Sequence, residues 1–161
     1  MLGRHVCVFD VGQAFLNSYL NKKGDELIME LNRDVADALT QVDDAYRRHQ
    51  RSDGSLLVKL NKALYGLKQA PRLWYDTLKA LLLKEGFKVS EMDDCHFVKV
   101  FEDKTSIDLS IHVDDGLATT DNREELDKLL NKLVKAFQIV DIKHEDEFEY
   151  LKMKFHIDRD T

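Results

Sequence analysis

The chain has 161 residues, of which 43% are hydrophobic, and carries a formal net charge of −6. This length supports one domain with its own core, and the acidic balance argues against strong autonomous binding to nucleic-acid phosphates. No apolar run has the length of a membrane span or the pattern of a signal peptide, so we expect an intracellular protein that contacts no membrane. Cys7 and Cys95 lie in apolar, strand-like stretches, which indicates buried free thiols in a reducing compartment.

The first third of the chain alternates short strands with helices. Residues 5–11 are typical of a buried strand with Asp10 near its end, and residues 12–20 of a short helix. A further strand is expected over 26–31. Asp34 is then predicted to cap a helix whose apolar face consists of Val35, Ala38, Leu39, Val42 and Tyr46.

A basic cluster closes that helix: Arg47, Arg48, His49 and Arg51. We interpret these residues as cations that complement the negative C-terminal end of the helix dipole. A contact with a nucleic-acid phosphate is the alternative interpretation. The next strand is expected over 55–60. A helix then begins at Pro71 and ends at Gly86, with its inner face formed by Leu73, Trp74, Leu78, Leu81 and Leu82.

The second half contains the clearest strand. Apolar residues alternate with polar ones over 106–113, and Asp114, Asp115 and Gly116 then form a turn before an extended stretch, which predicts a hairpin. Residues 95–101 are expected to pair with this strand. Asn122 is predicted to cap a helix with an apolar face of Leu126, Leu129, Leu130, Leu133, Val134 and Phe137, and 148–157 alternate as a last strand.

This order of elements predicts an α+β fold, an antiparallel sheet with helices packed mainly on one face. In a split β-α-β core the end of strand 5–11 lies beside the hairpin of 106–120, which brings Asp10 to Asp114 and Asp115. An isolated Asp-Asp-Gly would be only a solvated turn. Three neighbouring carboxylates need a cation, however, and two Mg²⁺ or Mn²⁺ ions held by them and by the Val11 carbonyl could run nucleotidyl transfer.

Three stretches carry a resemblance to a known family: FDVGQAFL at 9–16, LYGLKQAPRLWY at 64–75 and HVDD at 112–115. In this order and spacing they resemble motifs A, B and C of a reverse transcriptase, best those of copia-type retrotransposons. The resemblance implies an RNA-directed DNA polymerase with a palm-like sheet. It further implies that residues 1–161 are a single palm domain with part of the fingers, without the N-terminal fingers, the thumb or a ribonuclease H domain.

The resemblance also assigns roles to residues. Asp10, Asp114 and Asp115 are the implied catalytic carboxylates. Ala14 and Phe15 lie at the incoming nucleotide, where an aromatic ring would exclude a 2′-hydroxyl; a core Phe on a short helix is the alternative for Phe15. The nascent base pair is bordered by Tyr65, Gly66, Lys68, Gln69 and Pro71, and the primer is contacted by His112, Lys152 and Lys154.

His112 and the truncated ends of the chain favour the alternative of a non-catalytic remnant, whereas the three intact aspartates favour an enzyme. His112 replaces the Tyr that the family usually has before Val-Asp-Asp, which affects primer positioning, whereas Trp74 and Tyr75 are expected to pack against the sheet.

The implied partners are deoxynucleoside triphosphates and an RNA or DNA primer–template. The implied location is the cytoplasm, and virus-like particles if the element is active. We expect the chain alone to bind primer–template weakly and to polymerise poorly. A non-catalytic or domesticated remnant is the main alternative; an unrelated cyclase or nuclease would not explain residues 64–75.

Overall fold

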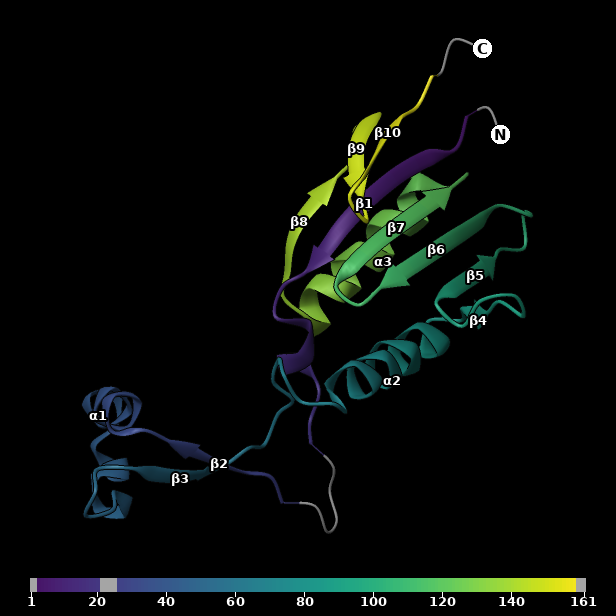
Figure 1. Ribbon diagram of the computed structural model, residues 1–161. Helices are drawn as coiled ribbons and strands as arrows, with labels where there is room; N and C mark the ends of the chain where they lie inside the picture. The colour runs from purple at the N-terminus through teal and green to yellow at the C-terminus, as the bar shows by residue number, and fades with distance from the viewer. Residues whose placement is uncertain (1–2, 21–25, 159–161) are drawn as a thin grey trace. The chain divides into compact units, whose positions relative to one another are not determined.

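The computed structural model describes residues 3–20 and 26–158 (Figure 1). The chain folds as two compact units: unit 1 comprises Met1–Ser18 with Leu64–Thr161, and unit 2 comprises Tyr19–Ala63. Among its described residues, unit 1 contains a six-stranded antiparallel sheet, two α-helices and the 3₁₀ helix η1 (Ala14–Asn17), which lies within the predicted short helix, so the α+β class is confirmed. The assignment of residues 1–161 to a palm domain with part of the fingers stays a prediction.

The sheet of unit 1 has the strand order β4-β5-β6-β7-β1-β8. The hairpin β6–β7 was predicted from the alternation of residues 106–113, and it lies beside β1 as expected from the split arrangement. The bounds of the strands are β1 His5–Val11, β4 Lys88–Val89, β5 His96–Val100, β6 Ser106–His112, β7 Asp115–Thr120 and β8 Ile139–Lys143.

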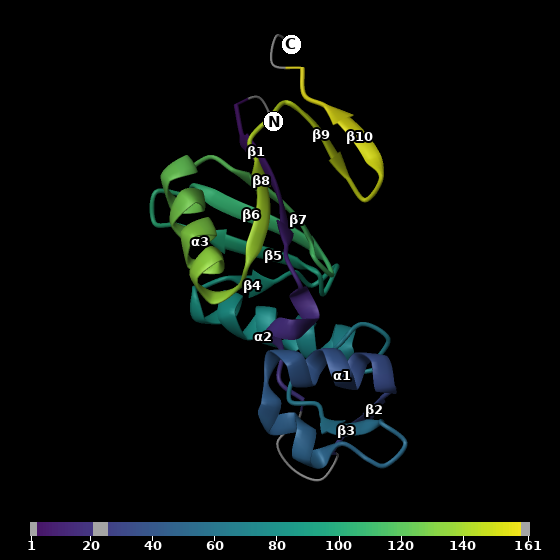
Figure 2. The ribbon, with the colours of Figure 1, turned by 90° about the vertical axis from the view of Figure 1, so that its left-hand side faces the viewer.

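One face of this sheet is buried and the other is partly open. Cys7, Ala118, Leu109 and Phe97 are aligned across four neighbouring strands, and none is more than 1% exposed. Since side chains alternate along a strand, this row marks the face that packs against helices α2 (Ala70–Lys84) and α3 (Arg123–Ala136). The β9–β10 hairpin lies on the other side of the sheet from α3 (Figure 2).

The two helices begin and end where their sequences predict. Pro71 stands in the first turn of α2, and Gly86 follows its end with φ +88°, a left-handed conformation that favours glycine. The Asn122 side chain accepts a hydrogen bond from the Glu125 amide and caps α3. The helices bury Ala70, Trp74, Leu78 and Leu82 from α2 and Leu126, Leu129, Leu130 and Leu133 from α3.

The prediction of one last strand over 148–157 is wrong. The segment forms a hairpin of β9 (Glu147–Tyr150) and β10 (Met153–His156), because Leu151 and Lys152 adopt left-handed φ angles of 52° and 64° and turn the chain. Tyr150 and Met153 are direct partners across the two-residue loop, so the apolar residues change from even to odd positions at the turn. Phe148 and Phe155 stack across the hairpin with ring centroids 5.2 Å apart.

Cys95 also departs from its prediction. Cys7 is buried in β1 as expected, and burial raises the pKa of its thiol to about 12. Cys95 is exposed, because it precedes β5 in a loop in which its amide donates a hydrogen bond to the Asp93 carboxylate. Both cysteines are free thiols, as expected.

Arg4 connects the start of β1 to strands β6 and β7 through side-chain hydrogen bonds. Its Nη2 atom donates to the Asp108 carboxylate at 2.7 Å and to the carbonyl oxygens of Ser106 and Thr119 at 3.2 and 3.0 Å. Burial alone would raise the pKa of Asp108, but the hydrogen bond and the charge of Arg4 outweigh it and hold that pKa below its ordinary value.

Asp108→Asn is therefore expected to lower the free energy of unfolding by about 1 kcal/mol at pH 7. Because the pKa of Asp108 is lowered in the fold, this contribution is fully present above about pH 4 and is lost as the pH falls through the lowered value. Urea unfolding of both proteins between pH 7 and pH 3 measures the difference. Asp76→Asn, which removes an exposed i,i+4 pair with Arg72, is the control, and a difference that does not change with pH would contradict the expectation.

Unit 2 pairs β2 (Ile28–Leu31) with β3 (Leu56–Lys59) and adds helix α1 (Arg33–Val42) and the 3₁₀ helix η2 (Asp44–His49). Its predicted strands are confirmed, but Asp34 does not cap α1. The cap is Asn32, whose side chain accepts from the Val35 amide at 3.1 Å. The predicted apolar face is also wrong: α1 buries Ala36 and Thr40, whereas Val35 is 49% and Val42 85% exposed.

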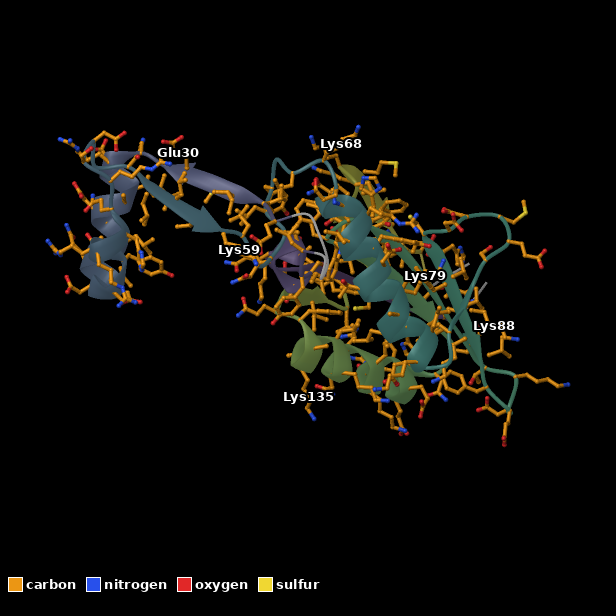
Figure 3. The ribbon with its side chains drawn as sticks, turned by 90° about the horizontal axis from the view of Figure 1, so that it is seen from below. Glu30, Lys59, Lys68, Lys79, Lys88 and Lys135 are labelled. Carbon is orange, nitrogen blue, oxygen red and sulfur yellow. The ribbon has the colours of Figure 1, made fainter. Side chains whose placement is uncertain are left out.

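The basic cluster ends η2, in accord with the interpretation as helix-ending cations. Arg47 pairs with Asp44 at 2.8 Å, and Arg51 pairs with Glu30 at 3.3 Å. Glu30 and Lys59 of this unit are labelled in Figure 3. In the part of the chain that the structure describes, no helix combines the length and the apolar character needed to cross a bilayer.

Candidate active site

A row of polar side chains crosses the open face of the sheet in unit 1. Asp10 on β1 is the direct partner of Asp115 on β7 and of Asp141 on β8, and Asp115 is in turn the partner of His112 on β6. Cross-strand partners point to the same face, with Cβ atoms about 5 Å apart. The fold thus brings Asp10 and Asp115 together as the sequence predicts, and adds Asp141, which the sequence analysis did not single out.

The backbone joins Asp114 to the same place. The Val11 amide donates a hydrogen bond of 2.9 Å to the Asp114 carbonyl, so the turn after β6 is fixed to the end of β1. Burial and the negative charges of Asp114, Asp115 and Asp141 raise the pKa of Asp10. The carboxylates are therefore close enough to repel one another.

A cleft of about 150 Å³ opens beside this row. Tyr150 of β9 closes one side: its hydroxyl donates to the Ser110 carbonyl at 3.4 Å, and burial raises its pKa. Lys143 also lines the cleft and pairs with Asp141 at 2.8 Å. Within residues 3–20 and 26–158, no three His, Cys, Asp or Glu side chains already converge as a group of metal ligands. The carboxylates lie on the same face of the sheet, but their oxygen atoms are not arranged around one metal position.

Gly116 allows β1 and β7 to carry their carboxylates side by side. It is the cross-strand partner of Phe9, whose ring is buried on the helix face of the sheet. A Cβ atom at position 116 would overlap with that ring. Glycine here thus lets the Phe9 ring cover the strand directly beside Asp115.

Tyr65 lies between Asp114 and Phe15 and contacts both. The Tyr65 hydroxyl donates to Asp114 Oδ2 at 3.3 Å, and its ring packs against that of Phe15 with centroids 4.4 Å apart. Burial and the negative charge of Asp114 raise the pKa of Tyr65. Phe15 is only 6% exposed and Ala14 is fully buried, whereas Tyr65 is 64% exposed. Motif B therefore contacts both motif A and motif C in this fold.

The remaining predicted residues lie on the loop before α2, on its first turn and on the β9–β10 hairpin. Gly66 has a φ of +94° with free space around it, so the backbone conformation and not crowding favours glycine there. Lys68, Gln69 and Pro71 are exposed on the loop and first turn that lead into α2, and Lys68 projects outward in Figure 3. Lys152 occupies the β9–β10 turn and Lys154 lies on β10, and both are exposed.

The comparison with known families decides the relationship. Residues 2–160 match the family model described as "Reverse transcriptase (RNA-dependent DNA polymerase)". The chain belongs to the reverse transcriptase family. The predicted resemblance to copia-type retrotransposons is confirmed by the named relatives, which are Pol polyproteins of such elements.

This reverse transcriptase chain spans less than a tenth of the length of each of three curated relatives. It is 36% identical over 117 residues to the retrovirus-related Pol polyprotein from transposon RE1 of Arabidopsis thaliana, covering 70% of the chain and 8% of the relative. It is 36% identical over 87 residues to that from transposon TNT 1-94 of Nicotiana tabacum, covering 54% of the chain and 7% of the relative. The transposon Ty1-MR1 Gag-Pol polyprotein of Saccharomyces cerevisiae is 31% identical over 94 residues, covering 56% of the chain and 5% of the relative.

Three residues near the carboxylates of this reverse transcriptase could not be assigned to the site from sequence. Asp141 belongs to the short stretch IVDIK, whose strand β8 was not predicted. Tyr150 was included in a continuous strand and not placed near a turn. Trp74 was expected only to pack against the sheet, but its indole also donates a hydrogen bond to the Val113 carbonyl at 2.6 Å. The β-branched residues that surround Asp141 in the sequence, Ile139, Val140 and Ile142, were the available signal for a strand there.

Proposed function

We propose that this chain is the palm, with part of the fingers, of an RNA-directed DNA polymerase that extends a primer on an RNA or DNA template. The observation that supports this most directly is the position of Asp10 opposite Asp115, with the Asp114 carbonyl bonded to the Val11 amide. Family membership supports the reaction class. Unit 1 would be the palm, and unit 2 would belong to the fingers.

The donor set suits a hard divalent cation. Asp10, Asp114, Asp115 and the Val11 carbonyl would hold two Mg²⁺ or Mn²⁺ ions, because carboxylate and carbonyl oxygens are the ligands these ions prefer. The raised pKa of Asp10 expresses a repulsion among carboxylates that a cation would relieve. When bound, the ions would supply charge stabilisation for an in-line phosphoryl displacement.

The other residues would bind and orient the substrates. The motif resemblance would place Phe15 under the incoming sugar, where it excludes a 2′-hydroxyl, and Ala14 beside the triphosphate; because Phe15 is 6% exposed and Ala14 is fully buried, only the edge of the Phe15 ring would be accessible to the sugar. Tyr65 would support Phe15, against which it packs. The border of the nascent base pair would be formed by Gly66, Lys68, Gln69 and Pro71, and the primer would be contacted by His112, Lys152 and Lys154.

A metal titration tests this function. Isothermal titration calorimetry should detect Mn²⁺ binding by the chain, and Asp114→Asn should reduce the affinity at least about 10-fold, because it removes a direct ligand. Asp94→Asn, which changes an exposed loop carboxylate, is the matched control and should bind as the wild type does. Single-nucleotide addition to a primer with millimolar Mn²⁺ should follow the same order of variants.

The same titration addresses the alternative. A chain that binds no Mn²⁺ at millimolar concentration would be a non-catalytic or domesticated remnant that retains the fold. Binding that is equally strong in Asp114→Asn would place the metal elsewhere and would remove the support for a polymerase site.

A further inference from the structure

The turn that carries Asp114 and Asp115 begins with a residue in an unusual conformation. Val113 has a φ of +57°, in the left-handed region. This region is unfavourable for a β-branched side chain and persists only where the surroundings impose it. Val113 is the first residue of the two-residue loop between the paired residues His112 and Asp115, a hairpin geometry that itself favours positive φ at this position. Because valine is β-branched, a contact from outside the hairpin can further stabilise this conformation.

Trp74 supplies that contact from the helix side of the sheet. Its indole Nε1 donates to the Val113 carbonyl at 2.6 Å. The indole is itself fixed: Trp74 is 1% exposed on α2, and its ring packs edge-to-face against Phe137 with centroids 5.0 Å apart. A buried donor held in one position can dictate the orientation of the peptide that accepts from it.

Side-chain packing contributes less to the orientation of this turn. A cavity of about 360 Å³ borders Val113, His112 and Ile111 on the side of α2. The turn is therefore not enclosed by close-packed side chains there, and Val113 itself is half-buried. Apart from the strand pairing of His112 with Asp115 and the bond from the Tyr65 hydroxyl to the Asp114 carboxylate, two hydrogen bonds fix the backbone of the turn at successive carbonyls, from Trp74 to Val113 and from the Val11 amide to Asp114.

We propose that Trp74 is a positioning residue: its indole N–H holds Val113 in the left-handed conformation and thereby aims the Asp114 and Asp115 carboxylates toward Asp10. This inference rests on the proposed function in so far as those carboxylates bind metal. It assigns to motif B a role in shaping motif C, through α2, that does not require contact with substrate.

Trp74→Phe is the informative variant, because it retains an aromatic ring and removes only the N–H donor and part of the ring area. We expect the Mn²⁺ dissociation constant to rise about 10-fold, as for a residue that orients a ligand. NMR should also show that the Val113 backbone leaves the left-handed region, from its coupling constant and its ¹³Cα shift. Phe137→Leu is the matched control: it disturbs the packing of Trp74 but leaves the N–H in place, so stability should fall while Mn²⁺ affinity stays within about 3-fold.

A second substitution separates positioning from a general structural effect. Val113→Gly removes the conformational penalty, since glycine adopts positive φ readily. In that background Trp74→Phe should change the Mn²⁺ dissociation constant by less than about 3-fold, which is a coupling between the two positions. The chain contains one tryptophan, so the indole N–H gives a single resonance that should shift when Mg²⁺ is added to the wild type and should not shift in Asp114→Asn.

The outcomes distinguish the two proposals. If Val113 keeps its conformation in Trp74→Phe, or if Phe137→Leu weakens Mn²⁺ binding equally, the positioning role of Trp74 is overturned. If Val113 changes conformation as expected but neither Trp74→Phe nor Asp114→Asn alters Mn²⁺ binding, the metal site of the proposed function is what fails.

Discussion

Asp10→Asn is expected to weaken Mn²⁺ binding by on the order of 100-fold and, in the metal-free protein, to raise the free energy of unfolding by about 1 kcal/mol. The two effects share one cause. Asp10 faces Asp115 and Asp141 across neighbouring strands, so its negative charge attracts a cation when one is present and is repelled by its neighbours when none is. Partial exposure to water limits the repulsion to this modest size.

The pH dependence gives a further check on Asp10. Because its pKa is raised in the fold, the wild type incurs no penalty below about pH 4, where the carboxyl is protonated in both states. The penalty grows as the pH rises through the raised value and is complete above it. Urea unfolding in EDTA should therefore show that Asp10→Asn is more stable than the wild type at pH 7.5 and about equally stable near pH 3.5.

Asp141→Asn is the matched control for Asp10→Asn. Asp141 also faces Asp10, but Lys143 pairs with it, and it is not among the proposed ligands. We expect its Mn²⁺ affinity to stay within about 5-fold of the wild type, less than the change caused by loss of a direct ligand. An Asp10→Asn protein that binds Mn²⁺ normally, or that unfolds more easily at pH 7.5, would contradict the expectation.

Gly116→Ala is expected to lower the free energy of unfolding by about 3 kcal/mol, the upper part of the range for overpacking a core. The added methyl group would overlap with the Phe9 ring, and Phe9 is 4% exposed, so the ring has little room to move. Separation of β1 from β7 would also move Asp10 away from Asp115, and Mn²⁺ binding should weaken with stability.

A double-mutant cycle identifies the clash as the cause. In a Phe9→Leu background the smaller side chain leaves space for the methyl group, so Gly116→Ala should cost less than about half as much. Urea unfolding of the four proteins measures the coupling. If Gly116→Ala lowers the free energy of unfolding equally in both backgrounds, the cause would be the strand backbone and not the Phe9 ring.

Much of unit 1 could be predicted from sequence, because its strongest patterns reflect burial on one side. The alternation of residues 106–113 specifies a half-buried strand, and in the structure Ile107 and Leu109 are buried while Asp108 faces the open side. Asn122 and Pro71 mark helix starts by chemistry that does not depend on the rest of the fold. The meeting of Asp10 with Asp115 followed from topology, since a split arrangement puts their strands next to each other.

The parts that sequence did not predict depend on contacts between distant residues. The α1 face was misjudged because Val35 and Val42 follow a helical period but remain largely exposed, while the small residue Ala36 is buried. The role of Trp74 depends on a carbonyl 39 positions away, to which no local pattern points. The roles of the individual site residues stay predictions from motif resemblance.

The position of β1 has a consequence for how the protein is made. Asp10 acquires its cross-strand partner only when Asp115 has been synthesised. At translation rates of roughly 5–20 residues per second, the first strand waits on the order of 5 to 20 s for its neighbour. During that interval the backbone N–H and C=O groups of this apolar segment have no strand partner. Strand pairings between residues so far apart in sequence also form slowly. Chaperone demand during synthesis should therefore centre on His5–Val11.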